Sequence, residues 1–340
     1  MSTAVVVTSI AGPIPILRSL AEGCAAAGWS FHVAGDRKSP ADFSLDHCHY
    51  LSLDAQKALP FRLPAITPEN SYVRKNLAYL QAIADGATQI IDTDDDNLPL
   101  PAFWRERSRA VTGDLFAPGG WVNTYALFAA TFSYPRGYSL DLARESTDIR
   151  HFTSLATTAT CPIQQGLVEE APDVDAIFRL FNADMPAFTQ RAPVILPAGN
   201  WCPTNSQDTL TFREAFPLLY LPATCTFRAT DIWRGLIAQR LLWTCGWSLS
   251  FHAPDVRQIR NPHSLMADFH LEVPVYLHSG KFAETLAKLD LPSGPEYLCD
   301  NLLRCYQALI ALDLFAAAEL DLVEAWIKDL AQAGWSPIPS

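Results

Sequence analysis

The sequence lacks any uninterrupted hydrophobic run near the length of about 18 residues that suggests a membrane-spanning helix. Its N-terminus also lacks the basic segment and the long apolar core of a signal peptide. We therefore expect a protein without a transmembrane segment and a cytoplasmic location. Positive charge is scarce too, because 25 Lys and Arg residues stand against 36 Asp and Glu residues, a formal net charge of −11. Nucleic acids and anionic membranes bind basic surfaces, so neither is expected as the main partner.

Closely spaced cysteine pairs, internal repeats and low-complexity segments are also absent. The eight Cys residues are scattered along the chain, and none of them form a C-x-x-C motif. This pattern excludes a zinc site or a small disulfide scaffold as the organising feature, and it favours buried, reduced thiols. A hydrophobic content of 49% in 340 residues suits one large α/β domain or two smaller ones.

The chain opens with a strand, a helix and a second strand at close spacing. Ala4–Thr8 predicts a buried strand, Pro13–Ala27 a helix that ends before Gly28, and Ser30–Ala34 the next strand. This order is typical of an open parallel sheet with a right-handed crossover. Ligands of such sheets bind at the carboxyl ends of the strands. The residues expected there are Thr8, Ser9, Asp36 and Arg37, although Asp36 fits equally well as a turn residue.

A helix is predicted over residues 72–84, with Ser71 as its N-cap. Arg74 and Lys75 fall in or near its first turn, where the helix dipole disfavours cations. A helix start with two cations and free N–H groups is a suitable site for a diphosphate. The alternative is that both side chains pair with carboxylates elsewhere on the surface.

The predicted helix leads into an apolar strand, Gln89–Ile91, that ends in a dense acidic cluster. The carboxylates of this cluster are Asp92, Asp94, Asp95 and Asp96. Such a group cannot be fully ionised without a cation, and oxygen ligands at a strand end suit Mg²⁺ or Mn²⁺ shared with substrate phosphates. A solvated acidic turn is the alternative. An EF-hand calcium loop is excluded, because Asn97 stands where that loop requires Gly and Phe103 where it requires Glu.

The second half of the chain carries fewer chemical signals. Thr230 is predicted to cap a helix over residues 230–243 that has Asp231 at its first position. Asp231 is a candidate general base, or simply a capping charge. Asp173 and Asp175 read as acids at another helix start, and either His252 or His263 could complete a metal shell or lie on the surface. After about residue 267 the pattern is helical, over residues 281–289, 295–314 and 316–333.

Six ordered motifs within residues 4–265 resemble the STELLO family. That family is assigned to the glycosyltransferases, and its plant members are Golgi membrane proteins tied to cellulose synthase assembly. The motifs are residues 70–76, 91–97, 164–166, 172–180, 205–207 and 230–235, the last followed by residues 239–243. The acidic strand end also resembles the D-x-D element of GT-A glycosyltransferases. A more distant similarity is to the reversibly glycosylated polypeptides, which are UDP-arabinopyranose mutases. Since no transmembrane anchor is expected, the Golgi location and the plant partner are not carried over.

The resemblance implies a GT-A-like, Rossmann-related α/β fold, an open mixed sheet flanked by helices. Residues 1–265 would form the nucleotide-sugar-binding catalytic domain, and residues 266–340 a helical extension outside the resemblance. Asp94 and Asp96 would bind the metal, with His263 as a further ligand, and Asp231 and Arg234 would be catalytic. Asp36 would read the nucleotide base, and Arg74 and Lys75 would balance the diphosphate. The remaining donor-site residues would be Thr8, Ser9, Arg37, Asn70, Asp94 and Asp95.

The function implied is a glycosyltransferase that depends on Mn²⁺ or Mg²⁺ and uses a nucleotide-diphosphate sugar, with a UDP-sugar as the expected donor. The acceptor would be a glycan, a lipid or a small molecule. Two alternatives stay open: a nucleotide-sugar mutase that needs no acceptor, and a non-catalytic nucleotide-sugar-binding factor. The second would associate peripherally with a polysaccharide synthesis complex.

Overall fold

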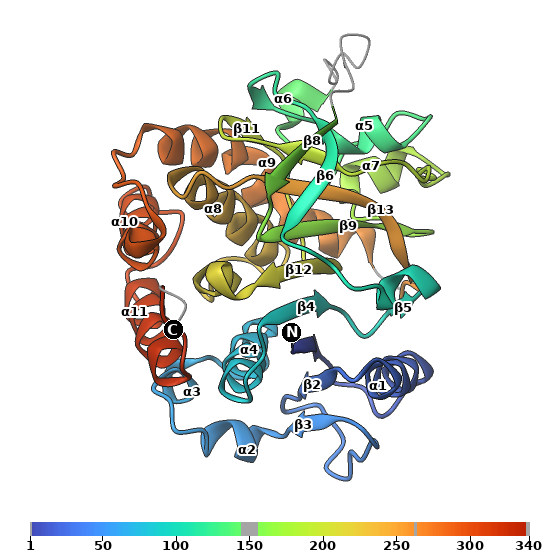
Figure 1. The fold of residues 1–340 in the computed structure, drawn as a ribbon, viewed down its shortest axis with the longest axis vertical. Helices are drawn as coiled ribbons and strands as arrows, with labels where there is room; N and C mark the ends of the chain where they lie inside the picture. Colours follow the sequence, from blue (N-terminus) through green and yellow to red (C-terminus); the bar gives the residue numbers. More distant parts are fainter. Residues whose placement is uncertain (1, 144–155, 262–263, 338–340) are drawn as a thin grey trace.

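The central feature of the structure is a mixed sheet of eleven strands, counted over residues 2–143, 156–261 and 264–337, which the computed structural model describes. The strands are β1 (Thr3–Thr8), β2 (Ser30–Ala34), β3 (His49–Leu51), β4 (Gln89–Thr93), β5 (Asn97–Pro99), β6 (Ala110–Leu115), β8 (Ala156–Thr160), β9 (Ile163–Glu169), β10 (Val194–Leu196), β12 (Asp208–Phe212) and β13 (Leu249–Gln258). Their order is β3-β2-β1-β4-β12-β9-β13-β10-β6-β8, and β5 pairs with β13 (Figure 1). The short strands β7 (Gly120–Trp121) and β11 (Asn200–Trp201) pair separately.

Helices lie on both sides of this sheet, so the predicted α/β class with an open mixed sheet is confirmed (Figure 1). The α-helices are α1 (Pro15–Ala27), α2 (Leu53–Lys57), α3 (Leu63–Ile66), α4 (Lys75–Ala84), α5 (Thr124–Phe128), α6 (Leu140–Ala143), α7 (Ala176–Phe181), α8 (Thr230–Thr244), α9 (Leu265–Lys288), α10 (Leu298–Ile310) and α11 (Glu319–Gln332). The 3-10 helices are η1 (Tyr72–Arg74), η2 (Pro101–Trp104), η4 (Arg213–Leu219) and η5 (Pro295–Tyr297).

The first strands form the parallel part of the sheet, as the sequence predicts. β1 pairs in parallel with β2 and with β4, with Thr8 opposite Ala34 and Val6 opposite Asp92. Both faces of β1 are buried: Val5 and Val7 join the core that contains α1, while the alternate residues join the core that contains α4. This explains why β1 reads as a continuous apolar run. The carboxyl ends of β1, β2 and β4 therefore meet at one edge.

Two residues predicted to be helix N-caps, Ser71 and Thr230, do not cap a helix. Ser71 makes no side-chain capping bond, because the chain first forms η1 and α4 begins only at Lys75. Thr230 is also not a cap: it lies inside α8, where its hydroxyl donates to the Thr226 carbonyl oxygen at 3.2 Å. The start of α1 is close to its prediction, and Gly28 ends that helix with a left-handed φ of 70°.

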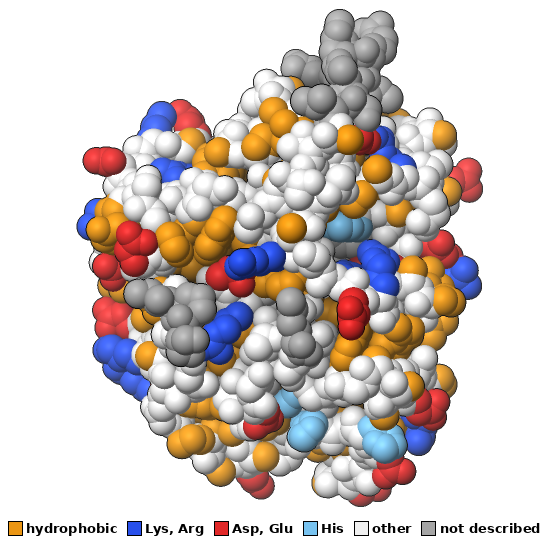
Figure 2. Space-filling view, in the orientation of Figure 1, with side chains coloured by type: hydrophobic (Ala, Val, Ile, Leu, Met, Phe, Trp, Pro, Cys, Tyr) orange, Lys and Arg blue, Asp and Glu red, His pale blue; other side chains and the backbone are white. Residues whose placement is uncertain are grey.

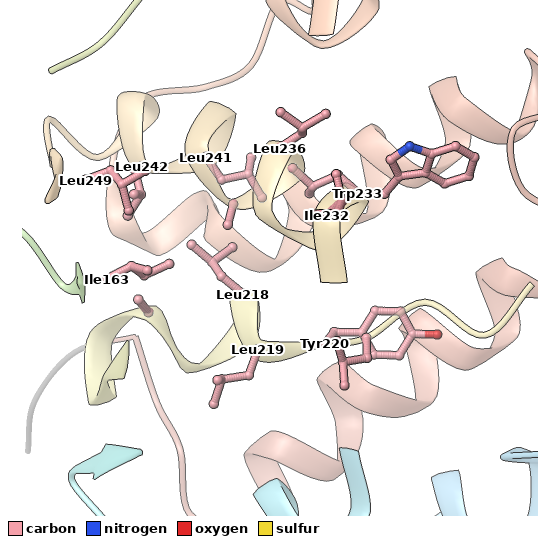
Figure 3. Close-up of a cluster of buried hydrophobic side chains, with 14 of the residues drawn as sticks. Ile163, Leu218, Leu219, Tyr220, Ile232, Trp233, Leu236, Leu241, Leu242 and Leu249 are labelled. Carbon is pink, nitrogen blue, oxygen red and sulfur yellow. The ribbon is translucent and has the colours of Figure 1, made fainter. Parts of the chain in front are cut away.

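Helices α8 to α11 pack against the rest of the chain through a shared core. Figure 3 shows Leu218 of η4 on the side that faces α8, toward Leu241, while Leu219 lies on the opposite side of η4 within the same core. The predicted helix over residues 281–289 corresponds to the last third of the longer α9, which ends at Lys288. No described helix is long and apolar enough to cross a membrane.

Helix α11 also contacts the N-terminal half, where it lies beside α3 and α4 (Figure 1). The Asp329 carboxylate accepts bonds from the backbone N–H groups of Arg62 at 2.9 Å and Leu63 at 2.7 Å, at the start of α3. Buried Glu319 accepts from Tyr220 Oη at 2.5 Å and from the backbone N–H of Thr224 at 2.7 Å. The division at residue 265 stays a prediction, and the helices after it contact α3 and α4 of the first half as well as α8.

Basic and acidic side chains are interspersed on the face drawn in Figure 2, with hydrophobic side chains between them. All eight cysteines are free, and four of them are buried: Cys24, Cys161, Cys202 and Cys305. Burial raises the pKa of the Cys202 thiol to about 12, so this thiol is protonated at neutral pH.

Candidate active site

A cavity of about 670 Å³ opens at the edge of the sheet where β1, β2 and β4 end. Its volume lies in the range of small-molecule sites, roughly 300–1,000 Å³. The sequence-predicted residues that line it are Thr8, Ser9, Asp36, Asn70, Arg74, Asp94, Asp95, Asp96 and Asp231. Arg37, Lys75 and Arg234 do not belong to this lining. His263 lies outside the described residues.

Asp92 points into the protein rather than into the cavity. Its carboxylate is fully buried between Lys75 Nζ, 2.5 Å from Oδ1, and Arg234 Nη1, 2.8 Å from Oδ2. Burial alone would raise the pKa of Asp92, but the two cations hold it below its usual value. One carboxylate of the acidic cluster is thus neutralised by the protein itself. This corrects the premise that all four share an external cation.

The cations at the start of the predicted helix also have internal partners. Lys75 Nζ donates to the Thr93 carbonyl oxygen at 2.6 Å as well as to Asp92. Arg74 is buried, and its guanidinium donates to Gln56 Oε1 at 2.5 Å and to the Thr67 carbonyl oxygen at 3.2 Å. Arg74 still lines the cavity, but neither side chain is a free surface cation. Their role toward a diphosphate stays a prediction.

Asp36 joins two loops at the cavity rim. Its carboxylate accepts from the backbone N–H groups of Arg37 at 2.7 Å, Asn70 at 2.8 Å and Ser71 at 2.7 Å. Asn70 has a left-handed φ of 53°, which these bonds help to hold. The Arg37 side chain turns outward to an ion pair with Glu69. Asp36 is therefore positioned to shape the rim, and the same bonds occupy its oxygens.

Asp94, Asp95 and Asp96 each reach the cavity, and each accepts at least one hydrogen bond from a neighbouring side chain. Asp94 Oδ1 accepts from Tyr72 Oη at 3.0 Å and Lys75 Nζ at 3.1 Å. Ser9 Oγ donates to Asp95 Oδ2 at 2.5 Å, and Gln258 Nε2 donates to Asp96 Oδ2 at 2.9 Å. The sequence therefore places the cluster correctly at the strand end.

Crowding at this cluster shifts the titration of Asp94. Burial raises the pKa of Asp94 to about 7, the nearby charges of Asp96 and Asp92 add to the effect, and Lys75 opposes it. Near neutral pH, a substantial fraction of Asp94 would therefore be protonated without an added cation. A divalent ion would favour the ionised form, so the local charge suits a metal.

The donor set for a metal is small. Within the described residues, no group of three or more His, Cys, Asp or Glu side chains is arranged to hold an ion. Mg²⁺ and Mn²⁺ sites in phosphate-transfer enzymes often use one or two carboxylates, with water and substrate oxygens as the other ligands. Asp94 and Asp96 fit that requirement. His252 lies outside the cavity lining, and burial together with Arg107 lowers the pKa of its imidazole to about 3.

Asp231 lies at the cavity beside a group of arginines that sequence reasoning missed. Its Oδ2 accepts from Arg136 Nη2 at 2.9 Å and from the backbone N–H of Ser206 at 3.3 Å. The arginines that line this part of the cavity are Arg136, Arg179, Arg228 and Arg260. Asp173 belongs to the same group, because its carboxylate binds Arg136 through two bonds of 2.7 and 2.8 Å. The only sequence signal for this arginine group was that Asp173 and Arg179 both fall in the motif of residues 172–180.

The reading of Asp173 as a helix acid is therefore wrong, whereas that of Asp175 is confirmed. Asp175 is the N-cap of α7 and accepts from the backbone N–H of Phe178 at 2.7 Å. Burial would raise the pKa of Asp173, but the Arg136 guanidinium holds it below its usual value.

The motifs of residues 164–166 and 205–207 lie behind the site and hydrogen-bond to each other. Gln165 Oε1 accepts from the backbone N–H of Asn205 at 2.9 Å, and Gln165 Nε2 donates to Asn205 Oδ1 at 3.1 Å. Arg234 Nη2 donates to Ser206 Oγ at 3.0 Å while its other nitrogen binds Asp92. Arg234 thus links α8 to β4 and holds Asp92 in place. Arg234 itself does not line the cavity.

The α/β fold carries a cavity of small-molecule size at its strand ends. The chain is also similar to known glycosyltransferases. Residues 228–338 match the family model of the STELLO glycosyltransferases. The chain is 28% identical over 342 aligned residues to STELLO2 of Arabidopsis thaliana, described as a "probable glycosyltransferase", and 28% identical over 338 to STELLO1. Each alignment covers 91% of this chain and 42% of the relative, so the chain spans less than half of their length.

The resemblance to the STELLO glycosyltransferases is thereby confirmed. Its predicted extent is wrong, however, because the matched residues 228–338 include α9 to α11. The C-terminal helices are therefore part of what this chain shares with the family.

Solved structures give weaker similarities. A mycobacterial protein of known crystal structure aligns with a TM-score of 0.41 and 10% identity, over 82% of this chain and 74% of its own. Glucosyl-3-phosphoglycerate synthase of M. tuberculosis aligns with a TM-score of 0.39 and 12% identity, over 82% and 80%.

Proposed function

We propose that this protein is a metal-dependent glycosyltransferase that uses a nucleotide-diphosphate sugar. The observation that carries the proposal is the convergence of Asp94, Asp95 and Asp96 on a cavity of about 670 Å³ at the carboxyl ends of parallel strands. The raised pKa of Asp94 supports it, because the cluster lacks enough positive charge to be fully ionised. The similarity to proteins described as glycosyltransferases agrees with this chemistry.

In this proposal, Asp94 and Asp96 hold Mn²⁺ or Mg²⁺, which supplies positive charge for the departing nucleoside diphosphate. Lys75 and Tyr72 orient Asp94, and Gln258 orients Asp96. Ser9 fixes Asp95 at the end of β1. Charge stabilisation on the leaving group would be the largest catalytic contribution.

Asp231 is the proposed general base for an acceptor hydroxyl. Its carboxylate lies at the cavity, and Arg136 and Ser206 fix one of its oxygens. Arg234 acts through Asp92 in this scheme, so we assign it to positioning the strand end. Thr8, Asp36 and Asn70 would line the part of the cavity that receives a UDP-sugar.

Calorimetric binding of UDP in the presence of Mn²⁺ tests the proposal. We expect Asp96→Asn to abolish Mn²⁺-dependent UDP binding, and Asp300→Asn, an exposed change on α10, to leave it unaltered. Equal UDP binding by wild type and Asp96→Asn would refute the assignment of the acidic cluster. Incubation with UDP-sugars alone then separates transfer from isomerisation, because only a mutase converts the donor without an acceptor.

A further inference from the structure

The arginine wall, defined as Arg136, Arg179, Arg228 and Arg260, comes from four separate parts of the chain. Arg136 precedes α6, Arg179 lies in α7, Arg228 precedes α8 and Arg260 follows β13. Arg136 also donates to the backbone carbonyl oxygen of Arg228, which ties two of these segments together. The wall is therefore built by tertiary structure, and its members face one cavity.

Three of these arginines already have carboxylate partners. Arg136 pairs with Asp173 at 2.7 Å and Asp231 at 2.9 Å. Arg228 Nη2 lies 2.7 Å from Glu272 Oε1, and Arg260 Nη2 lies 2.8 Å from Asp268 Oδ2. These ion pairs fix the directions of the three guanidinium groups. The fourth arginine, Arg179, takes no part in them.

Arg179 has no carboxylate within ion-pair distance among the described residues. Its Nη2 donates to the Pro172 carbonyl oxygen at 2.7 Å, its Nη1 contacts Met185 Sδ at 3.2 Å, and its Nε is buried without a partner. Burial lowers the pKa of Arg179 to about 10, and the positive charge of Arg260 adds to the effect. Within the arginine wall, the positive charge of Arg179 is thus not balanced by a carboxylate in direct contact.

A planar guanidinium with unused donors is suited to a phosphate or a carboxylate, which it can bind through paired hydrogen bonds. We propose that the arginine wall binds an anionic group of the acceptor, so that the acceptor is a phosphorylated or carboxylated molecule. We assign the bound anion to the acceptor because of Arg136, which donates both to the Arg228 carbonyl oxygen within the arginine wall and to Asp231. A general base must touch the acceptor hydroxyl, so groups bonded to it lie on the acceptor side.

This inference rests on the proposed function, since it uses Asp231 as the base and the acidic cluster as the donor site. The same anion chemistry could come from the diphosphate of the donor. The two sources differ in the residues they require. The donor needs Asp96 and a divalent ion, whereas an acceptor anion needs Arg179 and no metal.

Two binding measurements separate these sources. Inorganic phosphate is titrated in metal-free buffer, and UDP is titrated with Mn²⁺, against wild type, Arg179→Gln, Asp96→Asn and the exposed control Arg304→Gln. We expect Arg179→Gln to weaken phosphate binding by roughly tenfold or more, the usual effect of losing a hydrogen bond to a charged group. UDP binding should change by less than about twofold. Asp96→Asn should show the reverse pattern, and Arg304→Gln should match wild type.

Arg179→Lys keeps the charge without the planar fork, and we expect phosphate affinity between those of wild type and Arg179→Gln. If circular dichroism shows that Arg179→Gln is unfolded, Arg179→Lys replaces it in both binding measurements. Equal losses of phosphate and UDP affinity in the Arg179 variants would assign the wall to the donor and overturn the inference. Wild type that binds no phosphate would overturn it as well. Wild type that binds phosphate but no UDP with Mn²⁺ would instead refute the proposed function.

Transfer assays give the final test. A panel of UDP-sugars is paired with glucose 6-phosphate, glucuronate and glucose as acceptors. We expect product with an anionic acceptor only, and a KM for that acceptor raised roughly tenfold or more in Arg179→Gln. Equal use of glucose would contradict an anionic acceptor.

Discussion

Lys75 Nζ lies 2.5 Å from Asp92 Oδ1, and both side chains are fully buried. Arg234 binds the other oxygen of the same carboxylate at 2.8 Å. The structure therefore places two cations beneath the acidic strand end, and Lys75 also reaches Asp94 at 3.1 Å. When Asp94 is ionised, the two cations match the charges of Asp92 and Asp94. Asp95 and Asp96, which also reach the cavity, accept hydrogen bonds from the neutral side chains of Ser9 and Gln258.

Breaking this buried pair should be costly. We expect Lys75→Met to lower the free energy of unfolding by about 3–5 kcal/mol, because Asp92 would lose one of its cations inside the protein. Denaturant unfolding monitored by circular dichroism measures the change. Lys57→Met removes an exposed pair with Glu69 and should have little effect. Similar stability of the two variants would contradict the role of Lys75.

Mn²⁺ binding should depend on pH through Asp94, whose pKa is raised to about 7. The metal binds the ionised carboxylate, so the affinity should fall by up to about tenfold for each pH unit below that pKa and level off above it. Calorimetry in two buffers with different ionisation enthalpies should detect a released proton at pH 6 and almost none at pH 8.5. Asp94→Asn should remove this proton release together with most of the affinity. An affinity that does not vary between pH 6 and 8 would count against Asp94 as a ligand.

Asp208 and Asp255 form a second buried acid pair, away from the cavity lining. Burial and the charge of Asp255 raise the pKa of Asp208 well above its usual range, while Arg107, 2.5 Å from Asp255, helps to hold the pKa of Asp255 low. This upward shift favours the protonated form of Asp208. A raised carboxyl pKa means that stability decreases as pH rises from the unfolded pKa toward the folded one.

Two substitutions test this acid pair. Asp208→Asn mimics the protonated acid and should change the free energy of unfolding by less than about 1 kcal/mol at pH 7, with a smaller loss of stability toward alkaline pH. Asp255→Asn leaves Arg107 without a charge partner and should cost roughly 3 kcal/mol. Chemical denaturation from pH 5 to 9 measures both effects. The assignment fails if the two variants are equally unstable.

Asp231→Asn tests the proposed base directly. We expect near-normal UDP binding and a loss of turnover on the order of 10²–10⁴-fold, because the amide cannot accept the acceptor proton. Arg136 retains its two bonds to Asp173 in this variant, so the arginine wall should persist. Once a transfer reaction is identified, its rate and the UDP affinity of the variant provide the measurement. Unchanged turnover would remove Asp231 from the mechanism.

The sequence predicts the local elements near the site well, since the signals there are short-range. The apolar run of β1, the Gly28 stop of α1 and the acidic end of β4 are all visible within a few residues. The directions of long side chains are less predictable. Lys75 follows a helix start in the sequence, yet it turns beneath β4 to reach Asp92.

The arginine wall could not be predicted for a different reason. Arg136 and Arg228 are separated by 92 residues and meet through a side chain and a backbone carbonyl. Neither has a spacing or a flanking pattern that distinguishes it from a surface arginine. The hydrophobic cores that bring these segments together depend on the whole chain, including the helices that follow residue 265.

The bonds from Asp329 to the start of α3 span 267 and 266 residues. During synthesis, the amides of Arg62 and Leu63 are made before Asp329, so these bonds can form only after α11 has been synthesised. Until α11 docks, the start of α3 lacks its carboxylate acceptor, so these two bonds couple the last helix of the described structure to the first half of the chain.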